Sequence, residues 1–253
     1  MQARQTMTMQ TKTALIFAAG SGTRLGELTS SRPKALLEIN GHSLLEINLK
    51  KLESSGYQHV IINTHHFHEQ IETFVAHFDT PMSISISHEP GQALETGGGL
   101  LKALPLMAGC DAVLLHNVDV ITDLHTGILH QMLSVRNAAA VLAVSSRPST
   151  RQLLFDENHC LAGWTNSQTR EFRHVRGRKA VYSYAFSGVS CLNPAFFTSL
   201  GVQRITLVEL LLGLAEDHDV LAALPPASYW YDLGKAEQIP AITLAMKEKN
   251  ILP

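Results

Sequence analysis

Short apolar runs alternate with helix-like segments through the first half of the chain, and this alternation restricts the fold more than any other feature. The strand-like runs are Ala14–Ala18, Val60–Asn63, Ala112–Leu115 and Ala139–Val144. Continuous apolar runs of this length are typical of strands that are buried on both faces of a parallel sheet. Helices are expected at Leu45–Leu52, His68–Phe78, Gly97–Leu104 and Leu124–Val135. This spacing predicts βαβ units, and therefore an α/β fold with a mostly parallel sheet.

The pattern changes after Pro148. Short strand-like runs cover Leu153–Asp156 and Leu161–Trp164, and Val181–Leu192 is a long β-prone run. The polar and basic segment Asn166–Lys179 is predicted to be a mobile loop. This part of the chain therefore predicts a small β-rich insertion in the α/β fold.

The end of the chain returns to helical signals. Thr206 and Glu209 have the spacing of a capping box in front of a leucine-rich helix. A last helix is expected over residues 235–249. We expect residues 1–12 to be a disordered lead-in and residues 13–253 to form a single domain, because no linker interrupts the pattern.

Composition restricts the class of protein. A chain of 253 residues that is 45% hydrophobic can bury one substantial core. The formal net charge of −2 lacks the basic excess of a general nucleic-acid binder. No stretch approaches the roughly 18–20 apolar residues that a membrane span needs, and the polar N-terminus lacks a secretory signal. Three cysteines without CxxC spacing are expected to be small core residues in a reducing cytoplasm.

The segment Leu15–Lys34 carries the strongest functional signal. Its apolar run ends at Gly20 and Gly22, and glycines at such a turn let backbone N–H groups approach a phosphate closely. The spacing fits neither standard phosphate loop. A dinucleotide fingerprint needs a third glycine where this chain has Leu25, and a Walker loop needs Gly-Lys where the chain continues Gly-Thr-Arg.

The residues around these glycines resemble the signature of the sugar-1-phosphate nucleotidyltransferases. That signature reads roughly AAGxGTRLxPLTxxxPKPL, and Ala18–Leu25 reads AAGSGTRL, followed by Leu-Thr and by Pro33-Lys34. Glu27 and Ala35 stand where the family usually has proline, so a change in loop stiffness is expected without loss of the charged groups. The chain looks most like the compact uridylyltransferase and guanylyltransferase members.

The resemblance implies a Rossmann-like three-layer α/β/α fold and a Mg²⁺-dependent transfer of NMP from an NTP, UTP or GTP, to a sugar 1-phosphate. Arg24 is then expected to neutralise the leaving pyrophosphate, and Lys34 the α-phosphate or the incoming phosphate. The expected nucleotide-binding residues are Ala18, Ala19, Gly20, Ser21, Gly22, Thr23, Glu89, Gly97 and Asn117. The expected sugar-binding residues are Glu95, Thr96, Gly98, Asn166, Ser187 and Gly188.

Two aspartates complete the expected site. Asp119 ends an apolar strand, and ligands of parallel sheets bind beyond the carboxyl ends of strands. The resemblance makes Asp119 a Mg²⁺ ligand, with Asp232 in the sequence Trp-Tyr-Asp-Leu-Gly as the second. Mg²⁺ favours one or two carboxylates together with phosphate oxygens and water. Val118 replaces a usual glycine and could crowd the nucleotide's sugar.

Several alternatives stay open. A catalytically silent relative that senses nucleotides or sugar nucleotides would keep the same fold, and an NAD-type oxidoreductase is disfavoured by the glycine spacing. The acceptor could also be another phosphorylated alcohol, such as phosphocholine. No Glu-Lys-Pro tripeptide, which holds the sugar phosphate in longer relatives, occurs here, so the residue that contacts the acceptor phosphate is unassigned. The histidines of residues 65–68 favour an ordinary loop over a metal site, and the arginines of residues 170–179 a solvated face.

Overall fold

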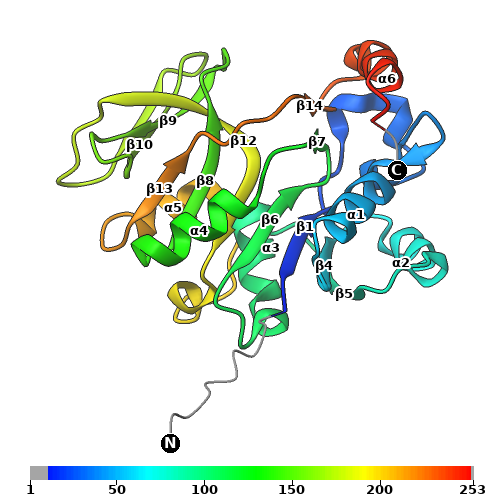
Figure 1. Ribbon diagram of the computed structural model, residues 1–253, viewed down its shortest axis with the longest axis horizontal. Helices are drawn as coiled ribbons and strands as arrows, with labels where there is room; N and C mark the ends of the chain where they lie inside the picture. The colour runs from blue at the N-terminus through cyan, green and yellow to red at the C-terminus, as the bar shows by residue number, and fades with distance from the viewer. Residues whose placement is uncertain (1–10, 252–253) are drawn as a thin grey trace, which may run out of the picture.

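A computed structural model describes residues 11–251 of the chain (Figure 1). The disordered lead-in expected for residues 1–12 falls mostly on residues 1–10, which lie outside the described part. Within the described part, no helix has both the length and the hydropathy to cross a bilayer. A cytoplasmic location stays a prediction.

A ten-stranded mixed sheet runs through the protein. Its strands are β1 (Thr13–Phe17), β4 (His59–Thr64), β5 (Ser83–His88), β6 (Val113–Asn117), β8 (Ala140–Ser145), β9 (Arg151–Phe155), β10 (Leu161–Asn166), β11 (Glu171–His174), β12 (Tyr182–Leu192) and β13 (Val220–Ala223). Parallel pairs join β5 to β4, β4 to β1, β1 to β6 and β13 to β8. Only β12 runs antiparallel to its neighbours β6 and β8 in this part of the sheet. The predicted mostly parallel α/β sheet is confirmed.

Helices and short pairs of strands surround this sheet. The helices are α1 (Leu44–Ser54), α2 (His68–His77), α3 (Glu95–Ala103), α4 (Gly127–Arg136), α5 (Leu207–Leu214) and α6 (Ile239–Glu248). The short pairs are β2 (Glu38–Ile39) with β3 (His42–Ser43), and β7 (Val120–Thr122) with β14 (Trp230–Asp232). Most predicted elements are recovered, although α4 begins three residues later than expected. The Leu124 N–H donates to Thr122 Oγ1 at 3.2 Å and so belongs to a turn before the helix.

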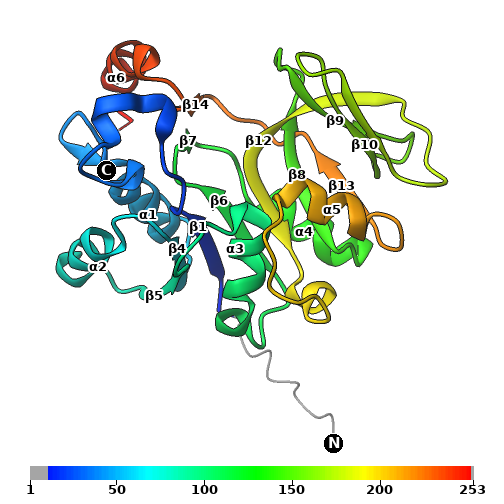
Figure 2. The ribbon, with the colours of Figure 1, turned by 180° about the vertical axis from the view of Figure 1, so that it is seen from behind.

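The alternation of β1 explains the three layers. Ala14 and Ile16 belong to the core that packs under α1, α4 and α6, whereas Leu15 and Phe17 belong to the core under α3 and α5. Figure 1 shows α1 and α4 in front of the sheet, and Figure 2 shows α3 and α5 on the opposite face. Both faces of β1 are thus covered by helices, which is why the strand reads as a continuous apolar run.

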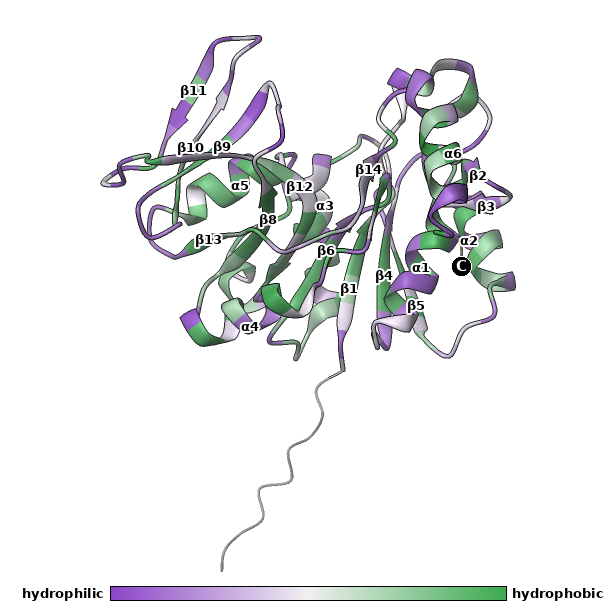
Figure 3. Ribbon diagram, turned by 45° about the horizontal axis from the view of Figure 1, so that its top comes forward, coloured by the Kyte–Doolittle hydropathy of each residue, from purple (hydrophilic) through white to green (hydrophobic). Residues whose placement is uncertain are grey.

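The β-rich insertion is built on β12, the longest strand. Its second half pairs with β6 and β8, whereas its first half pairs with β9, which begins the antiparallel series β9, β10 and β11. The expected mobile loop at residues 166–179 is wrong in part, because residues 171–174 form β11 on the edge of this series. All four residues of β11 are exposed, and Figure 3 shows the strand as hydrophilic, beside a hydrophobic central sheet. A polar edge strand gives no apolar periodicity from which to predict it.

Candidate active site

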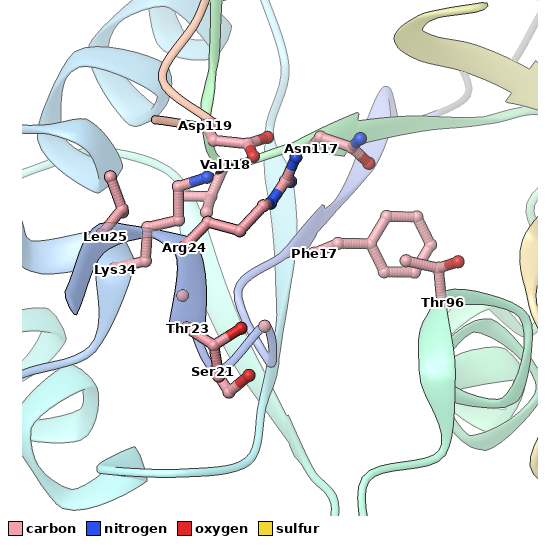
Figure 4. A pocket seen from close by; sticks show the side chains of 13 residues that line it. Phe17, Ser21, Thr23, Arg24, Leu25, Lys34, Thr96, Asn117, Val118 and Asp119 are labelled. Atoms are coloured by element: carbon pink, nitrogen blue, oxygen red, sulfur yellow. Dashed lines mark hydrogen bonds and ion pairs between the residues drawn. The ribbon is translucent and has the colours of Figure 1, made fainter. Parts of the chain in front are cut away.

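A cavity of about 280 Å³ opens at the carboxyl ends of β1 and β6 (Figure 4). Its lining comprises Phe17, Gly20, Ser21, Gly22, Thr23, Arg24, Leu25, Lys34, Thr96, Asn117, Val118, Asp119 and Gly234. This is the edge at which ligands of parallel α/β sheets bind. The fold therefore gathers the glycine loop, the start of α3, the end of β6 and the segment after β14 around one space.

The glycine loop is held by a tight turn. Gly22 has a φ of 65°, in the left-handed region, and a Cβ at this position would lie 2.8 Å from Thr29 Cγ2. The Thr29 hydroxyl donates to the Gly22 carbonyl at 3.0 Å and closes the loop. No heavy atom lies within 4 Å of the position of a Cβ on Gly20. The backbone at Gly20 therefore faces open space, where its N–H groups can meet an anion.

Two cations extend from this side of the cavity. Figure 4 shows that the side chains of Arg24 and Lys34 point toward Asp119. Lys34 is only 8% exposed, and its Nζ lies 2.5 Å from Asp119 Oδ2. Arg24 is exposed and forms no ion pair with any residue of the described part. One cation thus fixes a carboxylate, while the other is free for a ligand.

The pairing of β14 with β7 brings the two aspartates together. Asp232 lies opposite Val120 in this antiparallel pair, and the Leu233 N–H donates to the Asp119 carbonyl at 3.0 Å. Residues that are far apart in the chain therefore become neighbours through main-chain hydrogen bonds.

Asp232 sits in a polar but desolvated position. Burial raises the pKa of its carboxyl, the charge of Asp119 raises it further, and Lys34, Arg24 and Arg147 oppose the shift. Its Oδ1 is buried and has no hydrogen-bond partner among the described residues. An unpartnered anionic oxygen beside a second carboxylate fits a hard divalent cation. No group of three or more His, Cys, Asp or Glu side chains in residues 11–251 could hold a metal, so ligand and water oxygens would have to complete such a shell.

Val118 does not fill the cavity. Its side chain is 5% exposed and packs in the core that contains Ala18 and Leu25. Its N–H donates to the Phe17 carbonyl at 3.2 Å, and its carbonyl accepts from Asn48 Nδ2 at 2.9 Å. The valine therefore forms part of the floor of the site, and most of its bulk lies below the space where the sequence suggested crowding.

Three residues expected to bind the nucleotide are not part of the cavity lining. Ala18 is 3% exposed and donates its N–H to the Asn63 carbonyl at 2.9 Å, and Ala19 is not part of the lining. Glu89 is 1% exposed, and its two oxygens accept from Asn63 Nδ2 at 2.8 Å and from the Leu94 N–H at 2.7 Å. This burial contradicts a direct contact between Glu89 and a base. The carboxylate instead ties the end of β4 to the start of α3.

The glycines at the start of α3 serve close packing. A Cβ on Gly97 would lie 2.7 Å from the Thr206 carbonyl, and the Gly98 N–H donates to the Ile205 carbonyl at 3.0 Å. Gly97 and Gly98 are buried and absent from the cavity lining, in contrast to Thr96. The structure therefore explains both glycines by the approach of α3 to the segment before α5, and not by contact with the cavity.

The other residues expected at the sugar lie around the cavity rather than in it. Glu95 pairs with Arg204 at 2.8 Å, and Ser187 is buried. Gly188 has a φ of 77°, and a Cβ there would lie 3.2 Å from Asn117 Nδ2. Asn166 lines a second cavity of about 320 Å³ between the insertion and the start of α5. The structure thus brings Gly188 next to the site and leaves Asn166 in a neighbouring space.

The sequence alone missed Arg147. This residue follows β8, and its guanidinium carbon lies 4.2 Å from the centre of the Trp230 ring. Its charge acts on Asp232, so it belongs to the same electrostatic cluster as Arg24 and Lys34. The sequence did contain one signal for Arg147. It is a cation that closely follows the carboxyl end of the predicted strand Ala139–Val144, and ligands bind at that edge of a parallel sheet.

Known proteins share both sequence and fold with this chain. A family model described as the MobA-like NTP transferase domain matches residues 14–190. The N-acetylmuramate alpha-1-phosphate uridylyltransferase of Caulobacter vibrioides is 38% identical over 124 residues, which cover 48% of this chain and 51% of that protein. The mannose-1-phosphate guanylyltransferase catalytic subunit beta of Drosophila melanogaster is 26% identical over 228 residues, 88% of this chain and 59% of that protein. The chain thus spans about half to three fifths of the length of these relatives.

Solved structures confirm the Rossmann-like nucleotidyltransferase fold. A UDP-glucose pyrophosphorylase in complex with UDP-glucose superposes with a TM-score of 0.74 at 18% identity and covers 95% of this chain and 100% of its own. The inositol-1-phosphate CTP transferase of T. maritima superposes with a TM-score of 0.73 at 14% identity and covers 94% of this chain and 96% of its own. The family match over most of the chain is the decisive finding, and the chain belongs to the family of MobA-like NTP transferase domains.

Proposed function

We propose that the protein transfers a nucleotidyl group from an NTP to a sugar 1-phosphate and releases pyrophosphate. One observation carries the proposal: the glycine loop, two cations and Asp119 line a single cavity at the carboxyl edge of the sheet, and Asp232 lies beside Asp119. The named activities of the relatives, a uridylyltransferase and a guanylyltransferase, support UTP or GTP as the donor.

The chemistry suits these residues. An oxygen of the acceptor phosphate attacks the α-phosphorus, and the bond from that phosphorus to the oxygen bridging to the β-phosphate breaks. The nucleophile is already anionic and the pyrophosphate leaves as an anion, so no proton transfer is required. The obstacle is charge repulsion and alignment, which positioned cations relieve. Arg24 is assigned to the leaving pyrophosphate, and Lys34 to the α-phosphate.

Asp119 and Asp232 are the residues that would hold a divalent cation, with Mg²⁺ as the proposed ion. The unpartnered Asp232 Oδ1 and the neighbouring Asp119 carboxylate support this assignment. When bound, Mg²⁺ would neutralise phosphate charge in the transition state. The backbone of residues 20–23 and Asn117 are assigned to the nucleotide, and Thr96, Ser187 and Gly188 to the acceptor side.

The test is pyrophosphate release across a panel of donors and acceptors. UTP, GTP, CTP, ATP and dTTP are each combined with N-acetylmuramate α-1-phosphate, mannose 1-phosphate, glucose 1-phosphate and phosphocholine, with Mg²⁺ or with EDTA. We expect turnover with at least one sugar 1-phosphate, and loss of that turnover in EDTA. Turnover with phosphocholine and with none of the sugar phosphates would show that the acceptor is another phosphorylated alcohol and not a sugar 1-phosphate.

A panel without turnover would contradict the proposal. Calorimetric titration with UTP and GTP then separates two outcomes. Saturable binding without turnover would make the protein a nucleotide-sensing module, whereas absence of binding would reject a nucleotide site altogether.

A further inference from the structure

Arg147 is anchored beside the candidate site by two contacts. Its guanidinium carbon stacks over the Trp230 ring at 4.2 Å from the ring centre, and its Nη2 donates to the Phe186 carbonyl at 2.9 Å. The indole is fixed in turn, because Trp230 Nε1 donates to the Ser187 carbonyl at 2.8 Å. A guanidinium held on a tryptophan face and a main-chain carbonyl keeps one orientation.

This cation has donors without partners. Its Nε is buried and makes no hydrogen bond in the described part of the chain, and no carboxylate there lies within ion-pair distance of the guanidinium. The more exposed Arg173, Arg176 and Arg204 each have a carboxylate partner. Unsatisfied donors on a partly buried charge cost free energy. The buried Nε is closed to a ligand, but no residue of the described part accepts from Nη1, so this nitrogen remains available to an anionic ligand.

Arg147 and Arg24 both lie near Asp232. Trp230 and Asp232 lie two residues apart on β14 and share one face of that strand, so the guanidinium over Trp230 lies on the side of Asp232. A Cβ on Gly234 would contact both Asp232 Oδ1, at 3.1 Å, and Arg24 Nη2, at 3.6 Å. Burial lowers the pKa of Arg147, and the charge of Asp232 opposes that shift, as expected for neighbours.

The sheet separates the two arginines. Arg24 follows β1 and Arg147 follows β8, and the strands β6 and β12 lie between β1 and β8. Asp119 follows β6 and lies between them along the carboxyl edge. The main chains of the two arginines thus lie on different sides of Asp119 along this edge.

We propose that Arg147 binds the phosphate of the acceptor and presents its oxygen to the α-phosphorus, an inference that rests on the proposed function. An in-line displacement needs the entering and leaving oxygens on opposite sides of the phosphorus. Arg24 is assigned to the leaving side, and Arg147 supplies a cation on the other side. Arginine also offers parallel N–H donors that match two phosphate oxygens.

The kinetic test compares the two substrates in Arg147→Gln. We expect the KM for the sugar 1-phosphate to rise about 10- to 100-fold, the range for loss of a charged hydrogen bond. The KM for the NTP should stay near that of the wild type. Arg147→Lys keeps the charge but loses the paired N–H donors of the guanidinium. Its KM for the sugar 1-phosphate should therefore lie between those of the wild type and Arg147→Gln. Arg136→Gln makes the same charge change on the exposed end of α4, and should leave both constants unchanged.

Equal changes in both KM values, or no change in the acceptor KM, would overturn the proposal. A binding readout that does not depend on turnover accompanies the kinetics. Trp230 fluorescence, read in a Trp164→Phe background, is titrated with inorganic phosphate. Because the guanidinium stacks on this indole, we expect a saturable change that survives Arg24→Gln. Calorimetry should show that phosphate binding is lost in Arg147→Gln but kept in Arg24→Gln, and the reverse result would contradict the assignment.

Failure of this inference is distinguishable from failure of the proposed function. A wild-type protein without turnover on the whole panel rejects the function. Turnover with an unchanged acceptor KM in Arg147→Gln rejects only the role of Arg147. Thermal unfolding of each variant excludes misfolding, and if Arg147→Gln does not fold, Arg147→Lys decides: an acceptor KM equal to that of the wild type would count against the proposal.

Discussion

The two walls of the candidate site are built in different ways. The nucleotide wall is nearly continuous in sequence, since Phe17 and residues 20–25 line the cavity together with Lys34. The acceptor wall that we propose lies outside this lining and combines Arg147 after β8, Ser187 on β12 and Trp230 on β14, which meet through a ring stack and hydrogen bonds to main-chain carbonyls. A continuous wall leaves a motif in the sequence, whereas a dispersed wall depends on strand pairing and leaves isolated residues.

The two aspartates stand between these walls. Asp119 ends the strand next to the glycine loop, and Asp232 shares a strand face with the acceptor-side Trp230. We therefore expect three classes of variant. Some should impair the binding of both substrates, some should impair the binding of one substrate, and some should change only the stability of the fold.

Asp119→Asn should have the largest effect, because it removes a charge that both walls use. We expect kcat to fall by roughly 10²–10⁴-fold, the scale for loss of a transition-state electrostatic contact. The change keeps the shape of the side chain but weakens its pairing with Lys34. Steady-state turnover measures the loss, and Asp217→Asn at an exposed position is the matched control. Turnover near the wild-type value would reject the metal assignment.

Arg24→Gln should damage one wall. Because Arg24 lines the cavity and has no ion-pair partner in the described part of the chain, its loss should act through the NTP. We expect kcat/KM for the NTP to fall by about 10²–10³-fold. The KM for the acceptor should change little, which is the opposite of the result expected for Arg147→Gln. If Arg24→Gln altered only the KM for the acceptor, the assignment of Arg24 to the NTP and of Arg147 to the acceptor would be rejected.

The fold could be predicted from local patterns wherever strands are buried on both faces. The apolar run at β1 and the capping box at Thr206 are examples, and both are present as expected. The edge strand β11 could not be predicted, because its exposed residues carry no periodicity and its pairing with β10 is a tertiary contact. The predicted start of α4 was wrong for a similar reason. The Thr122 side chain accepts from the Leu124 N–H and holds a turn before the helix, and the apolar pattern does not show this contact.

The residues of the site could be predicted where a recognisable motif surrounds them, in the glycine loop and at Asp119. Gly20, Gly22 and Arg24 line the cavity as the motif indicated. Glu89 lies behind the wall, because a carboxylate near a ligand loop and one that ties a loop together look the same in a sequence. Arg147 has no motif around it, and only the strand order places it beside Trp230.

His116 on β6 provides a pH probe of the nucleotide wall. Burial lowers its pKa from 6.5 to about 4, while its Nδ1–H donates to the Asn117 carbonyl at 2.9 Å. The unfolded chain takes up this proton as the pH falls below 6.5, and the folded chain does so only near pH 4. This group should therefore cost up to about 3 kcal/mol of stability between pH 6.5 and 4, with no further loss below that range.

Urea unfolding at several pH values measures this effect. The free energy of unfolding of His116→Gln should vary less with pH over that window than that of the wild type. His77→Gln changes an exposed histidine on α2 and serves as the control substitution. Identical slopes for the wild type and His116→Gln would show that the imidazole is not held neutral beneath the nucleotide wall.

The smallest effects test whether the helices on the two faces of the sheet belong to one folding unit. Ser43 caps α1, on the side of the nucleotide wall, through the Glu46 N–H at 3.1 Å. Thr206 caps α5, under the insertion, through the Glu209 N–H at 3.2 Å. Ser43→Ala and Thr206→Ala should each cost about 1 kcal/mol, whereas Ser43→Thr and Thr206→Ser should keep most of the cap.

Calorimetric unfolding distinguishes one domain from two. If residues 13–253 form a single cooperative unit, each alanine variant should lower one shared transition by about 2–4 °C. Two transitions, each moved by only one of the variants, would mean that the helices on the two faces unfold separately. Helices α3 and α5 meet directly, because a Cβ on Gly97 would lie 2.7 Å from the Thr206 carbonyl and Thr96 Oγ1 accepts from the Leu207 N–H at 3.1 Å. Thr96 at the start of α3 also lines the cavity, so this packing couples α5 to the site, and the single transition is the outcome that the contacts predict.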